Sequence, residues 1–194
     1  GVALGDLDGD GDLDAWVAHW NYAPDRIWIN DGLGNFTDSS QALGNSGSGG
    51  VALGDLDGDG DLDAWVANSG ANRVWINQGG DQGGVAGNFA DSSQALGNSD
   101  SFGVSLGDLD GDGDLDAWVA NYGTNRVWIN DGGLQGGVAG NFADSGQALG
   151  NSLSYDVVLG DLDGDGDLDA WVANWSQPNR VWINDGLGNF ADSS

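Results

Sequence analysis

Aspartates alternate with other residues in segment 6–14, and this spacing is suited to binding a hard cation. The aspartates at positions 1, 3, 5 and 9 of the segment are Asp6, Asp8, Asp10 and Asp14. Alternate residues of a tight loop can aim their carboxylates inward, and Gly11 at position 6 frees the backbone so that Asp12 can offer its carbonyl oxygen. The chemistry that this segment could perform is coordination of a metal ion by oxygen atoms alone.

The same segment occurs four times along the chain, at intervals of 49, 53 and 53 residues. The aspartates of the later copies are Asp55, Asp57, Asp59, Asp61 and Asp63; Asp108, Asp110, Asp112, Asp114 and Asp116; and Asp161, Asp163, Asp165, Asp167 and Asp169. Four copies with the same oxygen spacing argue against a merely solvated acidic turn, because an empty loop would hold several carboxylates in mutual repulsion. We therefore treat these segments as candidate metal loops.

Calcium is the metal that this set of ligands favours. The chain contains no Cys, and none of the four segments contains His, which counts against zinc or copper. Magnesium gives up its water too reluctantly to favour a full protein cage. An EF-hand is excluded, because Val17 stands where that motif needs a bidentate Glu, and the nonapeptide repeats of calcium-binding β-helices are far shorter. The sequence predicts about one Ca²⁺ per repeat, four in total, bound structurally.

The residues around each segment predict short β-strands, because runs rich in Val, Ile and Trp alternate with clusters of Gly, Asn and Asp. In the first copy we expect strands at Val2–Leu4, Ala15–Ala18 and Arg26–Asn30, with a fourth near Phe36–Ser39. In the second strand both faces are apolar, so this strand should be buried on both sides. No run has a helical period of useful length.

These strands predict an all-β fold, a β-propeller-type repeat array with four blades of four antiparallel strands and a calcium loop between strands one and two. The chain reads as a single repeat domain, residues 1–194, with units at approximately 1–43, 44–96, 97–149 and 150–194. A linear stack of the same units fits the pattern as well. The sequence leaves open whether the array closes at four blades, pairs with another chain or belongs to a longer one.

The motif GDLDGDGDLDAWVA, followed by NRVWINDGLGNFAD, resembles the FG-GAP/VCBS repeats of integrin α-chain propellers and many bacterial surface proteins. The resemblance covers essentially the whole chain. It implies a β-propeller whose blades each hold Ca²⁺ in the hairpin between strands one and two, in an extracellular or cell-surface protein. The copy number departs from the family, since closed propellers of this kind commonly have seven blades.

Charge and composition exclude several functions. The formal net charge is -27, with 31 Asp and four Arg and no Glu or Lys, so the surface should repel nucleic acid and anionic membranes. No apolar run approaches the length of a membrane span. His19 is the single histidine and has no Ser or Cys partner at a recognisable spacing, so we expect no enzymatic activity.

Two residue types recur once or twice in every unit and have structural explanations. The tryptophans of strands two and three should fill the space between blades, with each indole N–H satisfied locally. They are Trp16, Trp65, Trp118 and Trp171, with Trp28, Trp75, Trp128 and Trp182. The arginine at the start of strand three should bond an aspartate or a loop carbonyl; it is Arg26, Arg73, Arg126 or Arg180.

The loops that differ between units are the candidate sites for a specific task. The loop after strand two carries Trp20, Tyr22, Tyr122 and Trp175 beside Asn and Ser, as candidate contacts to a ligand or partner. The loop after strand three is six residues longer in units two and three, as a spacer or an assembly contact. We expect a structural or adhesive module whose partners are other protein subunits, as a homo-oligomer or fibre. The alternative is a glycan-binding, lectin-like propeller that uses the aromatic loops.

Overall fold

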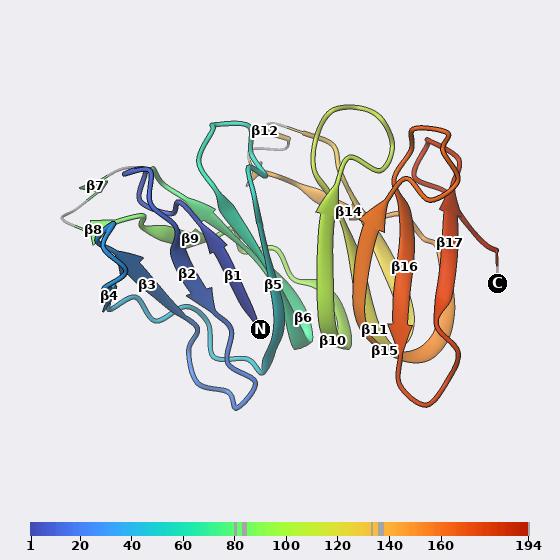
Figure 1. Ribbon diagram of the computed structural model, residues 1–194, viewed down its shortest axis with the longest axis horizontal. Coiled ribbons are helices and arrows are strands. Elements are labelled where there is room, and N and C mark those ends of the chain that lie inside the picture. The colour runs from blue at the N-terminus through green and yellow to red at the C-terminus, as the bar shows by residue number, and fades with distance from the viewer. Residues whose placement is uncertain (80, 83–84, 133, 136–137, 194) are drawn as a thin grey trace.

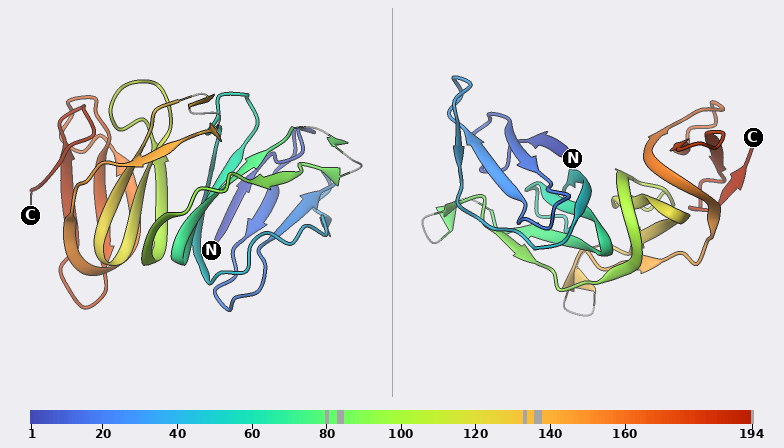
Figure 2. Two further views of the ribbon diagram at one scale, coloured as in Figure 1. Left: turned by 180° about the vertical axis from the view of Figure 1, so that it is seen from behind. Right: turned by 90° about the horizontal axis from the view of Figure 1, so that it is seen from below.

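The computed structural model describes residues 1–79, 81–82, 85–132, 134–135 and 138–193. In these residues the chain is all-β, and its four repeat units lie side by side along an open arc (Figures 1 and 2). The first unit is a four-stranded antiparallel sheet in the order β1-β2-β3-β4. Its strands are β1 (Val2–Gly5), β2 (Asp14–Val17), β3 (Arg26–Asn30) and β4 (Phe36–Asp38). The strands predicted for this unit are therefore confirmed to within one residue at each end.

The other three units share one ten-stranded sheet. Its members are β5 (Ser48–Gly54), β6 (Asp63–Asn77) and β9 (Phe89–Asp91); β10 (Leu96–Gly107), β11 (Asp116–Asn130) and β14 (Phe142–Asp144); and β15 (Leu149–Gly160), β16 (Asp169–Asn174), β17 (Arg180–Asn184) and β18 (Phe190–Asp192). The 15-residue strands β6 and β11 contain the second and third predicted strands of their units. Gly70 and Gly123, with φ of 95° and 98°, lie between those two parts, in a conformation that favours glycine.

Two features of the sheet were not predicted. β10 and β15 begin before the expected first strand and pair with the preceding unit, Leu96 with Asn72 and Leu149 with Asn125. The long loops of units two and three contain two-residue strand pairs, β7 (Asp81–Gln82) with β8 (Val85–Ala86) and β12 (Leu134–Gln135) with β13 (Val138–Ala139). The sheets of the described residues do not close on themselves, since no strand of the first unit pairs with one of the last. No helix in this part of the chain is long and apolar enough to cross a membrane.

The hydrophobic core lies between units rather than inside them. Three buried clusters each combine residues from two consecutive units. At each junction the strand-two tryptophan meets the strand-four phenylalanine of the next unit edge to face. The pairs are Trp16–Phe89, Trp65–Phe142 and Trp118–Phe190, with ring centroids 5.0, 4.6 and 6.4 Å apart. Because each unit buries its apolar surface only against a neighbour, the units depend on one another for stability.

Strand two is buried on both faces, as predicted, wherever a unit has two neighbours. All six residues 63–68 and all six residues 116–121 are buried. In the last unit Ala170 and Val172 are buried against the preceding unit, whereas Trp171 is 48% exposed. The tryptophan face therefore points to the following unit and the Ala/Val face to the preceding one. The prediction that each indole N–H is satisfied locally is wrong for Trp65, Trp118, Trp128 and Trp182, whose Nε1 atoms have no hydrogen-bond partner among the described residues.

A glutamine in each QALGNS connection fastens neighbouring units to each other. Gln94 Nε2 donates to the Gly140 carbonyl at 2.8 Å, and its Oε1 accepts from the Phe142 N–H at 2.9 Å. Gln41 and Gln147 make the same two bonds one junction earlier and later. The strand-three arginine supports this contact as predicted, since Arg126 Nη1 donates to the Gln147 carbonyl at 3.1 Å.

Replacing this glutamine should destabilise the array. In Gln94→Ala two backbone groups of the next unit lose their partners, and we expect the free energy of unfolding to fall by about 2 kcal/mol. Urea unfolding followed by tryptophan fluorescence would measure it. Gln177→Ala is the matched control, because Gln177 is exposed in a loop; equal effects of the two substitutions would contradict the prediction.

Candidate metal centres

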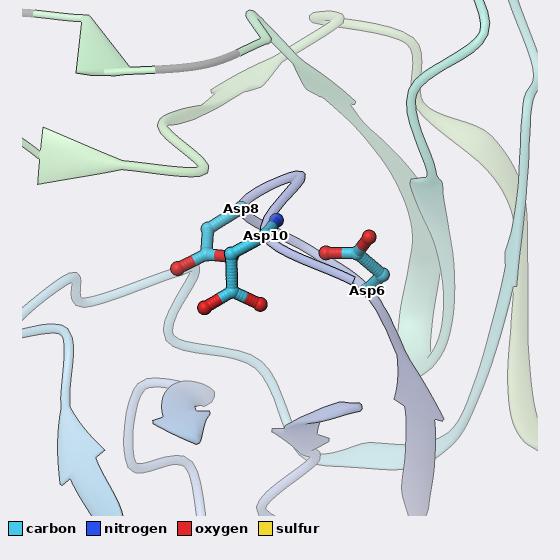
Figure 3. A group of neighbouring side chains, drawn as sticks. All are labelled: Asp6, Asp8 and Asp10. Atoms are coloured by element: carbon cyan, nitrogen blue, oxygen red, sulfur yellow. The ribbon is translucent and has the colours of Figure 1, made fainter. Parts of the chain in front are cut away.

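The structure gathers aspartate oxygens in every one of the four loops between strands one and two. Each group has three carboxylates that can place one oxygen apiece within 4.8 Å of one another. The groups are Asp6, Asp8 and Asp10; Asp55, Asp57 and Asp63; Asp108, Asp110 and Asp116; and Asp161, Asp163 and Asp169. Figure 3 shows the first group on the loop that joins β1 to β2. Positions 1 and 3 are thus common to all four groups, joined by position 5 in the first and position 9 in the others.

The backbone of each loop is shaped by its own carboxylates. Asp6 accepts the N–H groups of Gly9 at 2.8 Å and Gly11 at 3.0 Å, and Asp8 accepts that of Asp10 at 3.2 Å. The same bonds recur in the other three loops. Gly11 has a φ of 95°, so the sharp turn predicted at position 6 is present. These bonds hold the loop backbone in place, and each carboxylate oxygen keeps a second lone pair that a cation can use.

The position 9 aspartate joins the loop to strand three. Asp116 is fully buried, and its two oxygens accept the backbone N–H groups of Leu109 and Asn130, both at 2.8 Å. Asp14, Asp63 and Asp169 make the equivalent pair of bonds in their units. This carboxylate therefore holds position 2 of the loop against the end of the third strand.

An asparagine that the sequence analysis passed over completes this arrangement. It ends the RVWIN motif and is Asn30, Asn77, Asn130 or Asn184. Asn77 Nδ2 donates to the Leu62 carbonyl of its own loop at 3.3 Å and to the Leu7 carbonyl of the preceding unit's loop at 3.1 Å. Asn130 and Asn184 repeat both bonds. The asparagine stands at the same place in all four copies, and this recurrence could have identified it from the sequence.

The aspartates at positions 5 and 7 are placed differently. Asp59, Asp112 and Asp165 lie outside the compact groups, and each accepts the N–H of the residue two places on. At position 7, Asp12, Asp61, Asp114 and Asp167 direct their carboxylates against a glycine of the loop after strand three, namely Gly32, Gly79, Gly132 and Gly186. A side chain on these glycines would collide with the carboxylate. None of these position 7 carboxylates belongs to the compact groups.

The loop after strand three also covers the loop of the preceding unit. Gly87 and Gly140 have positive φ values of 58° and 57°, and a Cβ on either would strike the carbonyl of Leu7 or Leu56. Both positions therefore require glycine for space as well as for backbone conformation.

The electrostatics of the loops disfavour several ionised carboxylates without a counterion. Burial, together with repulsion from neighbouring aspartates, raises the pKa of the position 3 carboxyl in all four loops, Asp8, Asp57, Asp110 and Asp163. Burial raises the pKa of Asp63 and of Asp116 to about 7, despite the two N–H groups that each accepts. A divalent cation would remove this penalty by neutralising the group as a whole.

The raised pKa values predict how the stability of the calcium-free protein depends on pH. The folded protein binds more protons than the unfolded chain between the ordinary aspartate pKa of 3.8 and the value of about 7 for Asp63 and Asp116. The free energy of unfolding in a chelator should therefore fall as pH rises through this window, and the loss should be complete above it. Urea unfolding at intervals from pH 4.5 to 8 would measure the slope. A stability that rises with pH would contradict the prediction.

The aromatic residues of the variable loops lie at one end of the units, and two of them join a row. Trp20 stacks on Phe102 at 5.2 Å, Phe102 stacks on Tyr155 at 4.9 Å, and Tyr155 lies 5.8 Å from Trp175. Trp20, Phe102 and Tyr155 line an open groove of about 540 Å³. Phe102 and Tyr155 were not predicted, because they belong to the strand-one extensions. Tyr22 and Tyr122 are 67% and 65% exposed and have no ring contact with this row.

Together, the antiparallel four-stranded units, the cores between them and the repeated aspartate loops define a β-propeller-like repeat protein. The model of the FG-GAP-like repeat matches residues 6–66, 55–119 and 108–172. The chain therefore belongs to the FG-GAP-like repeat family. Each matched segment runs from one aspartate loop to the second strand of the next unit, so it contains the interface between two units. No curated protein sequence matches the chain.

Two examples show which solved structures are similar in fold. One is a lectin from Agrocybe aegerita, whose structure explains its specific recognition of non-reducing terminal N-acetylglucosamine. It is 23% identical, with a TM-score of 0.56, over 97% of this chain and 49% of the lectin. The other is the Nup170 amino-terminal domain of Chaetomium thermophilum in complex with Nup53, 10% identical, with a TM-score of 0.52, over 99% of this chain and 28% of that one. The chain thus spans about half of the lectin's length.

Proposed function

We propose that this chain is a calcium-binding repeat module in which Ca²⁺ holds each unit together. The observation that carries the proposal is the fourfold recurrence of three clustered carboxylate oxygens in a loop of fixed backbone. The ligands would be the carboxylates of positions 1 and 3 with that of position 5 or 9, and the carbonyl of position 7. All of these ligand atoms are oxygens, which suits calcium. The nitrogen and sulfur ligands that zinc and copper prefer are missing from this set.

In this proposal the ion links two parts of a unit that are distant in sequence. The position 9 aspartate already connects the loop to strand three through two backbone N–H groups. An ion bound beside it would tie the same strands more tightly and would neutralise the repulsion within the loop. The energy of binding then contributes directly to the energy of folding.

The proposal is tested by counting bound calcium. Isothermal titration calorimetry on the chelator-treated protein should give four Ca²⁺ per chain, and the double variant Asp108→Asn/Asp110→Asn should bind three. The double variant Asp100→Asn/Asp156→Asn removes the same charge outside the loops and should still bind four. A wild-type protein that binds no calcium at millimolar concentration would overturn the proposal.

We further propose that the module is extracellular or at the cell surface, has no catalytic activity of its own and serves as a structural or adhesive unit in an assembly. Near-identical units with the same exposed loops suit repeated contacts with other subunits. The clusters of carboxylates among the described residues are those that the calcium proposal already uses. The formal net charge of -27 makes nucleic acid an unsuitable partner.

Glycan binding is a second candidate function, favoured by the row of aromatic rings. Trp20 and Trp175 are 49% and 63% exposed, and exposed rings beside a groove can stack on the apolar face of a sugar. The likeness to the lectin supports the suitability of the fold alone. A glycan array with and without calcium would test it, with loss of the signal expected in Trp20→Ala. Tyr122→Ala, outside the row, is the control, and an array without any signal would dismiss this candidate.

A further inference from the structure

The two end units expose apolar residues whose counterparts in the other units are largely covered. In the first unit Phe36 is 46% exposed, whereas the equivalent Phe89, Phe142 and Phe190 are 6%, 5% and 9% exposed. Leu4 and Leu13 are also exposed, at 60% and 56%, whereas their counterparts in the later units are partly buried. These residues are here called the head face. In each later unit, the equivalent residues pack against the preceding unit.

The last unit exposes the other half of the same contact. Trp171 and Leu162 are each 48% exposed, whereas the equivalent residues of the first three units are no more than 1% exposed. Val181 is partly exposed, whereas Ile27, Val74 and Val127 are fully buried. These residues are here called the tail face. In each earlier unit, the equivalent residues are covered by the following unit. The chain therefore carries both halves of an interface that it forms three times internally.

The polar groups of the two faces complement each other in the same way. In the internal contacts the strand-three asparagine donates to the loop of its own unit and to position 2 of the preceding loop. Asn30 Nδ2 donates to the Leu13 carbonyl at 3.2 Å and makes no second bond of this kind within the described residues. The Leu162 carbonyl, in the last aspartate loop, is the acceptor that a head face would meet.

We propose that the head face of one copy of this chain binds the tail face of a second copy. The contact would repeat the internal ones, with Phe36 edge to face with the tail-face tryptophan of the partner copy and Asn30 donating to the last aspartate loop of that copy. The fourth metal loop is then completed across two subunits. The inference rests on the assembly role proposed above and names its partner, a second copy joined head to tail. Such contacts give rings when the rotation closes and filaments when it does not; the open arc of Figure 2 leaves both faces accessible.

Sedimentation velocity in calcium, over a range of protein concentrations, tests the proposal. The wild-type chain should exceed the monomer mass of 19.8 kDa, and Phe36→Asp and Trp171→Asp should each remain monomeric. An equimolar mixture of the two variants should form a species of twice the monomer mass, because one intact head and one intact tail remain. Leu33→Asp is the matched control. Leu33 is 85% exposed although a unit follows its own, and the equivalent Leu187 is 71% exposed although a unit precedes its own. This position therefore belongs to neither face.

The outcomes separate this inference from the calcium proposal. A wild-type chain that stays monomeric at millimolar concentration, or variants that fail to pair on mixing, would overturn the head-to-tail contact. If Phe36→Asp loses its β-sheet circular dichroism, Val2→Asp replaces it, since Val2 is 64% exposed whereas its equivalent Val157 is 3% exposed in the core between the last two units. Calcium titration of the monomeric variants then reports on the metal loops independently of assembly.

Discussion

Removing calcium should lower the midpoint of thermal unfolding by more than about 20 °C. At a free calcium concentration a thousandfold above the dissociation constant, each site stabilises the folded state by about 4 kcal/mol. The four loops act on one array of mutually dependent units. In a chain of this size 1 kcal/mol corresponds to about 2–4 °C. Two carboxylates about 5 Å apart repel by about 3 kcal/mol at an effective dielectric of 20, so the empty loops add strain. Differential scanning calorimetry with 1 mM calcium or with a chelator would measure the shift.

Two controls separate specific binding from charge screening. Sodium chloride at 0.3 M weakens repulsion between exposed charges but should recover only a small part of the lost midpoint. Magnesium at 1 mM should also recover little, because it keeps its water and demands a stricter geometry. A midpoint that does not respond to the chelator would show that these loops are not structural calcium sites.

The variant Asp116→Ala should destabilise the protein more than replacement of any other aspartate in the same loop. It removes the acceptor of two buried backbone N–H groups, those of Leu109 and Asn130. Each buried group without a partner costs about 1–3 kcal/mol, so we expect a loss of about 2–5 kcal/mol even in a chelator, and more in calcium. Urea unfolding under both conditions would measure the two losses.

Asp112→Ala is the comparison within the same loop. Asp112 is exposed and accepts the backbone N–H of Asp114 at 2.9 Å, and it lies outside the compact carboxylate group. Its replacement should have little effect on the stability of the calcium-free protein. Equal losses for Asp112→Ala and Asp116→Ala in a chelator would refute the positioning role assigned to position 9.

Much of the local structure could be predicted from the sequence because it depends on short-range patterns. The continuous apolar run located strand two and its two buried faces, and the tryptophans of strand two in the first three units were correctly placed between units. The aspartate spacing indicated which loop would gather carboxylates. By contrast, the extensions of β10 and β15 were missed, because segments such as Leu96–Gly107 contain Gly, Asn and Ser, which have little strand propensity of their own. They are strands because the preceding unit supplies a partner.

The repeat, the strand segments, the aspartate loops and the family could all be inferred from the order of the residues. The identity of the carboxylates that meet depends on long-range contacts, because Asp116 is held by the N–H of Asn130, 14 residues away, and Asn130 in turn donates to Leu56, 74 residues away. The folded structure also places the core between units and gives each end unit one half of the same interface. These contacts join residues from different repeats, and a pattern that is identical in every copy does not say which copy each residue meets.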